Sequence, residues 1–418
     1  MNHDMIQHYL KVAVRNILKY KLQSITSIVG LAVGFTCFTF ATLWIRHELT
    51  YDSFHQGAER IYLVRAQSDI SINGLSNRTP YPLAAYLQKS LPEVEAASNV
   101  QPDRHTFLRL ENESKTLLVI GADSAFMQMF GIELLKGSNH FLQESSSEVA
   151  ITAEWAAEIF GQEDPIGKEL DLNNRKMKIG AVVTGWSKHS NLPYGVLRSN
   201  NPFREWRGAT VETFIRLNRG VDTDVFEKKI AAIKLTGFDK ESGLGNLSVT
   251  PITALRYAGY LPQGEVTMSM NYIVYFCLIS GLVIVCSLFN YLTLFISRLR
   301  MRGRELALRR ICGAGTSALF VQLAVEFLIV LVSALLMGVW LIELFGAKFL
   351  YFSELSMTLR DIHIQGFCYL SGMMVLSFTG ALIPIHYFRK RTLHESINGI
   401  TADRRQETGC ASPDLSYN

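Results

Sequence analysis

The sequence predicts an α-helical membrane protein with four transmembrane helices and a mixed α/β extracytoplasmic domain inserted between the first and second helices. Of its 418 residues, 48% are hydrophobic and only 19% are charged, whereas ordinary soluble proteins have about 25% charged residues. The charged residues are missing from four long apolar stretches. Residues 46–270, between the first two stretches, have an ordinary charge content and therefore predict a folded domain that faces water.

The first apolar stretch, residues 22–45, contains no charged residue. As a helix it would be about 36 Å long, enough to cross a bilayer core of about 30 Å. We expect the other transmembrane helices at residues 271–296, 318–342 and 362–388, because lipid offers no partner to an unpaired backbone amide. The first stretch is longer than the apolar core of a signal peptide and no small-residue cleavage site follows it, so we expect an uncleaved anchor.

The distribution of Lys and Arg predicts the orientation, because short basic flanks stay in the cytoplasm. Such flanks occur at residues 1–21, at residues 297–317, and at the start of the tail, residues 389–418. Residues 46–270 instead contain 24 basic and 27 acidic residues, and the short loop at 343–361 contains two basic and three acidic residues. We therefore expect both termini in the cytoplasm and the large domain on the outer side.

Within the large domain, strand and helix patterns alternate along the chain, which predicts one or two small α/β subdomains. The expected strands are residues 60–70, 115–120, 176–183 and 211–217, and the expected helices are residues 82–89, 122–130, 152–160 and 223–233.

No set of catalytic residues is recognisable, so we predict that this chain is not an enzyme and holds no catalytic, cofactor or metal site. Residues 161–169, GQEDPIGKE, look like a phosphate-binding loop, but the spacing of its glycines is one residue too long and Glu169 replaces the required hydroxyl. The histidines lack the spacing of metal ligands, and Asp52, Asp123 and Glu154 show no pairing. We expect no nucleic-acid partner.

Three residues inside the apolar stretches have a predicted role. Gly30 and Gly34 have the G-x-x-x-G spacing that lets another helix approach closely, although this spacing is also common by chance. Glu326 is an intramembrane acid, about two turns inside the third stretch. Such an acid suggests an arginine partner or a polar path, but near a helix end it can also be structural, snorkelling to the surface or pairing with the arginine loop.

The loop at residues 297–317 contains the sequence SRLRMRGRELALRRICGAGT. Glu305 and Arg309 have the favourable i, i+4 spacing within a short helix, which Gly313 and Gly315 would end. Its charge alone is explained by contact with anionic lipid. A fixed acid among arginines is more specific than that, and favours docking into a groove of a cytoplasmic partner.

Residues 302–315, RGRELALRRICGAG, resemble the coupling segment of FtsX-like and MacB-type ABC transporter permeases, which reads R-x-x-E-I-G-[IL]-R-[RK]-A-L-G-A. Three further segments are similar to the MacB-like periplasmic core domain of that family. They are residues 51–62, which contain YDSFH and RIY, residues 126–137, and residues 160–183, which contain FG, DPIGK and IGAVV. The order of one span, a large outer domain and three more spans is also the family layout.

The resemblance implies a permease-like subunit of the inner membrane, with its large domain in the periplasm. It also implies that the subunit forms a homodimer, or a heterodimer with a related permease, and recruits a separate cytoplasmic ABC ATPase that binds the ATP. A periplasmic adaptor and membrane lipid are further candidate partners. By position, the ATPase-coupling residues would be Arg302, Arg304, Glu305, Arg309, Arg310 and Gly313, and the helix at the membrane interface would contain Lys11, Arg15, Lys19 and Lys21.

The resemblance leaves several functions open. The family couples ATP hydrolysis to movements of the periplasmic domain, for export or for mechanotransmission, with an amphiphilic, peptide or lipoprotein cargo or with none. An alternative is a membrane-anchored sensor or scaffold, or a regulator of a cell-wall hydrolase, without transport. The chain has no nucleotide-binding domain like that of the fused exporters, and it can be a short form or half of an eight-helix form.

Overall fold

The computed structural model divides into two compact units, each described here by itself. A membrane unit comprises residues 1–45 and 274–418, and a sheet unit comprises residues 46–273. The structure describes residues 3–68, 74–109, 114–186, 189–201, 205–206, 210–233, 235, 244–258, 268–301, 316–353, 355 and 357–380.

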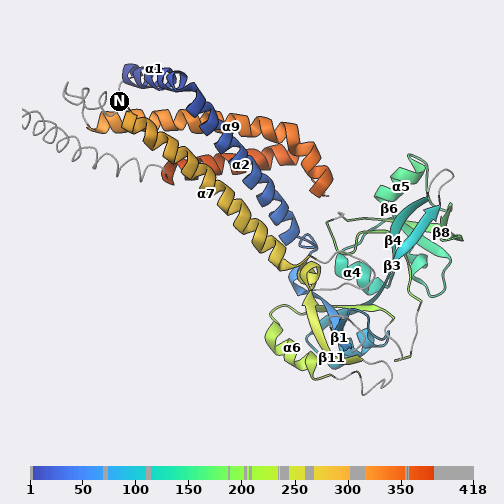
Figure 1. Cartoon of the computed structure of the whole chain (residues 1–418). Helices are drawn as coiled ribbons and strands as arrows, with labels where there is room; N and C mark the ends of the chain where they lie inside the picture. Colours follow the sequence, from blue (N-terminus) through green and yellow to red (C-terminus); the bar gives the residue numbers. More distant parts are fainter. Residues whose placement is uncertain are drawn as a thin grey trace, which may run out of the picture. The chain divides into compact units, whose positions relative to one another are not determined.

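Within the described residues, four helices are long and apolar enough to cross a membrane, as predicted. They are α2 (Lys21–Leu49), α7 (Met270–Met301), α9 (Thr316–Ser353) and a helix at Leu359–Gly380. A shorter helix, α1 (His3–Lys19), precedes them (Figure 1). The long helices pack around a common apolar core that contains Phe35, Tyr291, Phe327 and Leu370.

The third membrane helix is longer than predicted. We expected it to end at residue 342, before a loop at residues 343–361, but α9 continues to Ser353. Tertiary packing explains the difference, because Phe349 stacks on Phe40 of α2 with ring centroids 4.4 Å apart. Glu343, which was assigned to the loop, pairs with His363 instead. The predicted fourth helix, residues 362–388, is described only up to Gly380.

The sheet unit is built on one mixed sheet whose strands run in the order β11-β1-β10-β3-β4-β9-β6-β8-β5, with β2 beside β1 and β7 beside β3 and β8. The strands are β1 (Ile61–Ser68), β2 (Leu75–Ser76), β3 (Val94–Arg109), β4 (Ser114–Ala122), β5 (Leu134–Gly137), β6 (Glu148–Thr152), β7 (Glu169–Leu172), β8 (Arg175–Val183), β9 (Tyr194–Ser199), β10 (Glu212–Leu217) and β11 (Leu244–Pro251).

The long strand β3 joins the two halves of this sheet. Its first part, Val94–Val100, pairs with β10, and its second part, Gln101–Arg109, pairs with β4. The four strands predicted from sequence correspond to β1, β4, β8 and β10. The other strands were not predicted, because β5, β6 and β7 are short and β3 and β9 contain polar residues within the sheet.

Helices cover both faces of the sheet. They are α3 (Leu83–Ser90), α4 (Ser124–Phe130), α5 (Ala153–Phe160) and α6 (Thr223–Ala231), and all four were predicted. One face packs on α4 through residues such as Ile120, Phe126 and Phe214. The opposite face packs on α3 and α6 over one half of the sheet and on α5 over the other half. Figure 1 shows α6 beside β11, and α5 beside β6.

Candidate functional site

The sheet unit begins with the last turn of α2, and this turn carries a buried acid. Glu48 is only 3% exposed. Its carboxylate accepts two hydrogen bonds from the guanidinium of Arg256, one from Nε and one from Nη2 at 3.1 Å. Arg256 belongs to the short 3₁₀ helix η4 (Ile252–Tyr257), more than two hundred residues further along the chain. The two parallel hydrogen bonds fix the guanidinium in one orientation against the buried carboxylate.

Two tyrosines complete the surroundings of this ion pair. Arg256 lies over the ring of Tyr51, 4.0 Å from its centroid, in a cation–π contact. The hydroxyl of Tyr257 donates to the backbone carbonyl of Glu48, one of the carbonyls that a helix end leaves without an intrahelical partner. Burial and the charge of Glu48 raise the pKa of Tyr257 to about 12, so its hydroxyl stays protonated as a donor.

Arg256 also contacts the segment that leads into the second membrane helix. The backbone N–H of Met268 donates to the carbonyl of Arg256 at 3.1 Å, two residues before α7 begins at Met270. Burial by itself lowers the pKa of Arg256, but hydrogen bonding and charge from Glu48 outweigh this and raise it. One permanently charged residue therefore connects the last turn of α2 with the residues before α7.

A second buried group holds the chain just after α2. Asp52 is 0% exposed and has a positive φ of 56°. Its carboxylate accepts hydrogen bonds from the Ser190 hydroxyl, from the Asn191 backbone at 3.0 Å and from the Asn191 side chain at 2.6 Å. His55 Nε2 lies 3.5 Å from the same carboxylate. We call Glu48, Asp52, Ser190, Asn191 and Arg256 together the α2 clasp.

The chemistry of the α2 clasp is that of a structural joint. The Ser190 hydroxyl is buried; it donates to the Asp52 carboxylate and accepts from the backbone N–H of Leu192, so it holds two segments of the chain together. No group of three or more His, Cys, Asp or Glu residues that could hold a metal occurs in the described part of the chain. Asp123 likewise has a structural role, because its carboxylate caps α4 by accepting from Phe126 N at 2.8 Å.

The spacing of these residues in the sequence gave no sign of the α2 clasp. Asp52 was recognised only as an available carboxylate, and Glu48, Arg256, Ser190 and Asn191 were not selected at all. Their partners are 138 to 208 residues apart, whereas periodicity reports only near neighbours. The one usable signal was the YDSFH sequence at residues 51–55, on which the family resemblance partly rests.

In the membrane unit, α1 is amphipathic and packs on α9. Val12, Ala13 and Asn16 are buried, and the predicted interface residues Lys11, Arg15, Lys19 and Lys21 are exposed. Beside them, Leu10, Val14 and Leu18 form an exposed apolar row at helical spacing. A helix with an apolar row next to a basic row is typical of a membrane–water interface.

Glu326 of α9 is buried, with 4% of its surface exposed. The side-chain amide of Asn16 in α1 donates to its Oε2 at 3.4 Å. The sequence suggested an arginine partner or a snorkelling side chain; the arginine loop lies outside the described residues, and this amide is one partner that the structure shows. The contact attaches the amphipathic helix α1 to the third membrane helix.

Gly30 and Gly34 both lie on the side of α2 that faces α7. A Cβ added to Gly34 would lie 2.2 Å from Oγ and 2.8 Å from Cβ of Ser287, which is too close without a movement of the helices. A Cβ added to Gly30 would lie 3.5 Å from the Asn290 side chain, an ordinary contact. The close approach of the two helices therefore depends on Gly34.

The predicted coupling residues Arg302, Arg304, Glu305, Arg309, Arg310 and Gly313 lie outside the described residues. They fall between α7 and α9 in the chain. Their coupling role therefore stays a prediction.

Four membrane-crossing helices and a mixed α/β unit between the first two define a class of membrane subunit. Comparison with known families identifies it. Residues 24–233 match the model of the MacB-like periplasmic core domain, and residues 277–393 match the FtsX-like permease C-terminal model. The chain therefore belongs to the FtsX- and MacB-type family of ABC transporter permeases.

A curated relative is the macrolide export ATP-binding/permease protein MacB of Shewanella sp. (strain W3-18-1). It is 26% identical over 275 residues, which cover 62% of this chain and 40% of the relative. The chain thus spans about two fifths of the length of that relative.

Solved structures also resemble the chain. A permease-protein domain from Porphyromonas gingivalis has a TM-score of 0.39 at 21% identity and covers 52% of this chain and 99% of its own. The periplasmic region of MacB from Actinobacillus actinomycetemcomitans has a TM-score of 0.36 at 14% identity, covering 48% and 92%. The extracellular domain of the ABC-type transporter YknZ from Gram-positive bacteria has the same score and identity, covering 46% and 99%.

Proposed function

We propose that this chain is the transmembrane subunit of an ABC transporter in the inner membrane and that it transmits ATP-driven movements of its membrane helices to its sheet unit. A separate cytoplasmic ABC ATPase would bind and hydrolyse the ATP, and would dock on the segment that contains Glu305 and Arg309. The sheet unit would lie in the periplasm and both termini in the cytoplasm. Family membership supports the transporter class, and the α2 clasp supports the transmission.

The observation that carries the proposal is the way in which α2 ends. It is one uninterrupted helix from Lys21 to Leu49, and its last turn lies inside the sheet unit. An α-helix resists bending, so a displacement along it reaches its end with little loss unless a proline or bulge intervenes. None of its residues is proline.

At that end, the α2 clasp holds the chain on two sides. Glu48 is fixed by Arg256, and Asp52 is fixed by Ser190 and Asn191. The Glu48 carboxylate is buried, and removing Arg256 would leave its charge without a partner. We expect these contacts to pass a displacement of α2 to the loop at Ser190–Asn191 and to η4.

The test uses the full chain, co-expressed with the ATPase and purified in detergent. Replacing Glu305 and Arg309 together by alanine should abolish co-purification of the ATPase and stimulation of its activity. The double variant Glu48→Gln/Arg256→Gln, which keeps a hydrogen-bonding pair without the charges, should retain the complex. It should lose the nucleotide-dependent change in protease sensitivity of the sheet unit.

Lys176→Gln provides the control, because its ion pair with Glu169 is 3.4 Å long and both side chains are more than half exposed. It should behave like the unaltered chain in every assay. An intact complex with normal ATPase activity in the Glu305/Arg309 variant would refute the docking site. A sheet unit that never responds to nucleotide would favour the sensor or scaffold alternative.

A further inference from the structure

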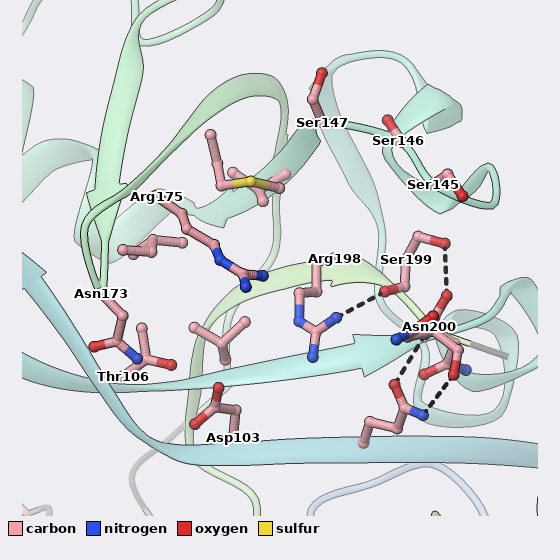
Figure 2. A pocket seen from close by; sticks show the side chains of 16 residues that line it. Asp103, Thr106, Ser145, Ser146, Ser147, Asn173, Arg175, Arg198, Ser199 and Asn200 are labelled. Atoms are coloured by element: carbon pink, nitrogen blue, oxygen red, sulfur yellow. Dashed lines mark hydrogen bonds between the residues drawn. The ribbon is translucent and has the colours of Figure 1, made fainter. Parts of the chain in front are cut away.

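The sheet unit contains a polar pocket of about 760 Å³, a volume typical of small-ligand sites. It lies on the α5 face of the sheet, beyond the apolar core. Its walls come from β3, the loop at Ser145–Ser147, the turn between β7 and β8, and the end of β9. Figure 2 shows Arg175 and Arg198 extending into the hollow, with Asp103 and Asn200 on its other sides.

Two guanidinium groups of this pocket have no acidic partner among the described residues. Neither Arg175 nor Arg198 lies within salt-bridge distance of a carboxylate in that part of the chain. Arg198 makes one long hydrogen bond, 3.4 Å, to the carbonyl of Ser199. Most of the donors of both side chains are therefore available to an oxyanion, which a guanidinium binds with two parallel hydrogen bonds.

The position of Arg175 is fixed by a tight turn. Asn173 and Asn174 both have positive φ, 52° and 64°, and join β7 to β8 with Leu172 opposite Arg175. Asparagine tolerates this left-handed conformation, as a two-residue hairpin requires. The Asn173 carboxamide oxygen accepts from Phe107 N at 2.8 Å, which attaches the turn to β3. The turn thus places the backbone of Arg175 at the edge of the pocket.

The opposite wall is also ordered. The Gln101 side chain pairs with both backbone groups of Asn201, donating to its carbonyl at 3.0 Å and accepting from its N–H at 2.9 Å. Asn200 is 6% exposed, and its amide donates to Asn99 O at 2.8 Å. Its Oδ1 accepts no hydrogen bond from the described residues. This oxygen is fully buried, so Asn200 forms part of the wall of the pocket.

Charge and shape restrict the ligand further. Asp103 is the one acid among the lining residues, so two arginines leave a net charge of +1 in the pocket. This balance suits a single carboxylate, and a phosphate dianion would be repelled by Asp103. Apolar side chains, among them Val119, Leu172 and Met177, line the same pocket. The Asp103 carboxylate can accept a hydrogen bond from an N–H group of the ligand. The ligand therefore has one carboxylate, a neighbouring N–H donor and an apolar group.

We propose that this pocket binds the free C-terminus of a short peptide whose last residue is apolar. The terminal carboxylate pairs with Arg198 and Arg175, a backbone N–H of the peptide donates to Asp103, and the last side chain contacts the apolar wall. This ligand goes beyond the proposed function and does not depend on it, because binding requires neither an ATPase nor movement of α2.

The experiment measures binding to the full chain in detergent by calorimetry, without nucleotide or ATPase. The probes are the peptide acetyl-Ala-Ala-Leu with a free carboxylate, the same peptide with a C-terminal amide, and inorganic phosphate. The free acid should bind, and the amide should bind at least about tenfold more weakly, because it loses the charge-assisted hydrogen bonds. Arg198→Gln and, separately, Arg175→Gln should each weaken binding of the free acid by about tenfold or more.

Lys176→Gln is the matched control, because it removes the same charge from the neighbouring residue of β8, which does not line the pocket. It should leave the affinity unchanged. Because Arg175 is exposed on a hairpin, its variant tests the site even if Arg198→Gln fails to fold. Equal binding of acid and amide, no effect of either arginine, or no binding of the free acid would overturn the proposal. Phosphate binding in place of the peptide would also overturn it.

Discussion

At the scale of the residue, Asp52 shows that burial and hydrogen-bond partners decide the role of a carboxylate. In the sequence it is one of many acids, but in the structure it is fully buried, has a positive φ, and is the acceptor for Ser190 and Asn191. A buried carboxylate is stable only when its hydrogen-bonding capacity is used. The contacts across the chain therefore make Asp52 a structural residue.

Replacing Asp52 by alanine should strongly destabilise the sheet unit. The change removes the carboxylate that accepts from Ser190 and Asn191 and places an alanine at positive φ, so we expect a loss of about 2–4 kcal/mol. Thermal unfolding of the full chain in detergent should show the transition of this unit about 5–10 °C lower. Asp224→Ala, at an exposed position in α6, is the control and should shift the transition by little. Similar shifts for both variants would contradict this role of Asp52.

The sequence predicted the roles of individual residues less well than it predicted the helices and strands. Gly30, Gly34 and Glu326 were selected from their local context, and the structure places each of them in a helix contact. Glu48, Arg256, Arg175 and Arg198 were not selected, because nothing in their neighbourhood distinguishes them from other charged residues. Their roles arise from partners and surroundings that only the folded chain brings together.

At the scale of the element, the helices α2 and α7 approach closely at Gly34. Membrane helices gain little from hydrophobic burial against each other, so tight packing at small residues matters more than in water. Ser287 of α7 occupies the space that a side chain at position 34 would need, whereas position 30 has room. The two glycines of the G-x-x-x-G sequence are therefore not equivalent.

Gly34→Ala should destabilise the membrane unit by about 1–3 kcal/mol, because the added methyl group overlaps Ser287 and the helices must move apart. Gly30→Ala should have little effect, and it is the natural control. The measurement is the thermal stability of the purified chain in detergent, compared between the two variants. The second change Ser287→Gly should restore much of the stability of Gly34→Ala. Failure of this rescue, or equal effects of the two alanines, would exclude the steric explanation.

Element boundaries were predicted well where local signals dominate and less well elsewhere. The helix α6 was predicted from its periodicity, and its first turn is capped by Asp222, which accepts from Asp224 N and Val225 N. The end of α9 was wrong by about three turns. Glu343 and Lys348 suggested a loop, but Phe349 packs on α2, and this contact keeps the segment helical.

At the scale of the whole molecule, the proposed function needs the sheet unit and the coupling segment to lie on opposite sides of the membrane. The charge distribution predicts this arrangement, because short flanks rich in Lys and Arg stay on the cytoplasmic side of the membrane. The helix α2 separates the basic flank at residues 1–21 from the sheet unit, and α7 separates the sheet unit from the basic flank that follows it. If both helices cross the membrane, the sheet unit lies on the side opposite to both flanks.

Thiol labelling in spheroplasts tests this orientation directly. In a variant without the native cysteines, a cysteine at Gln162, an exposed residue, should react with a membrane-impermeant maleimide. A cysteine at Arg304 should react only after the membrane has been permeabilised. Reaction of both positions in intact spheroplasts would contradict the proposed transmission across the membrane. Labelling of both after denaturation serves as the control for expression.

The sequence by itself determined the four membrane helices, the place of the α/β domain between the first two, and the family. These properties depend on long apolar runs and on local motifs, which a linear chain displays in full. The tertiary structure alone decided the α2 clasp, the inequality of Gly30 and Gly34, and the arginine pocket. Those features depend on contacts between residues far apart in the chain, where burial and the available partners set the energy of each charge and hydrogen bond.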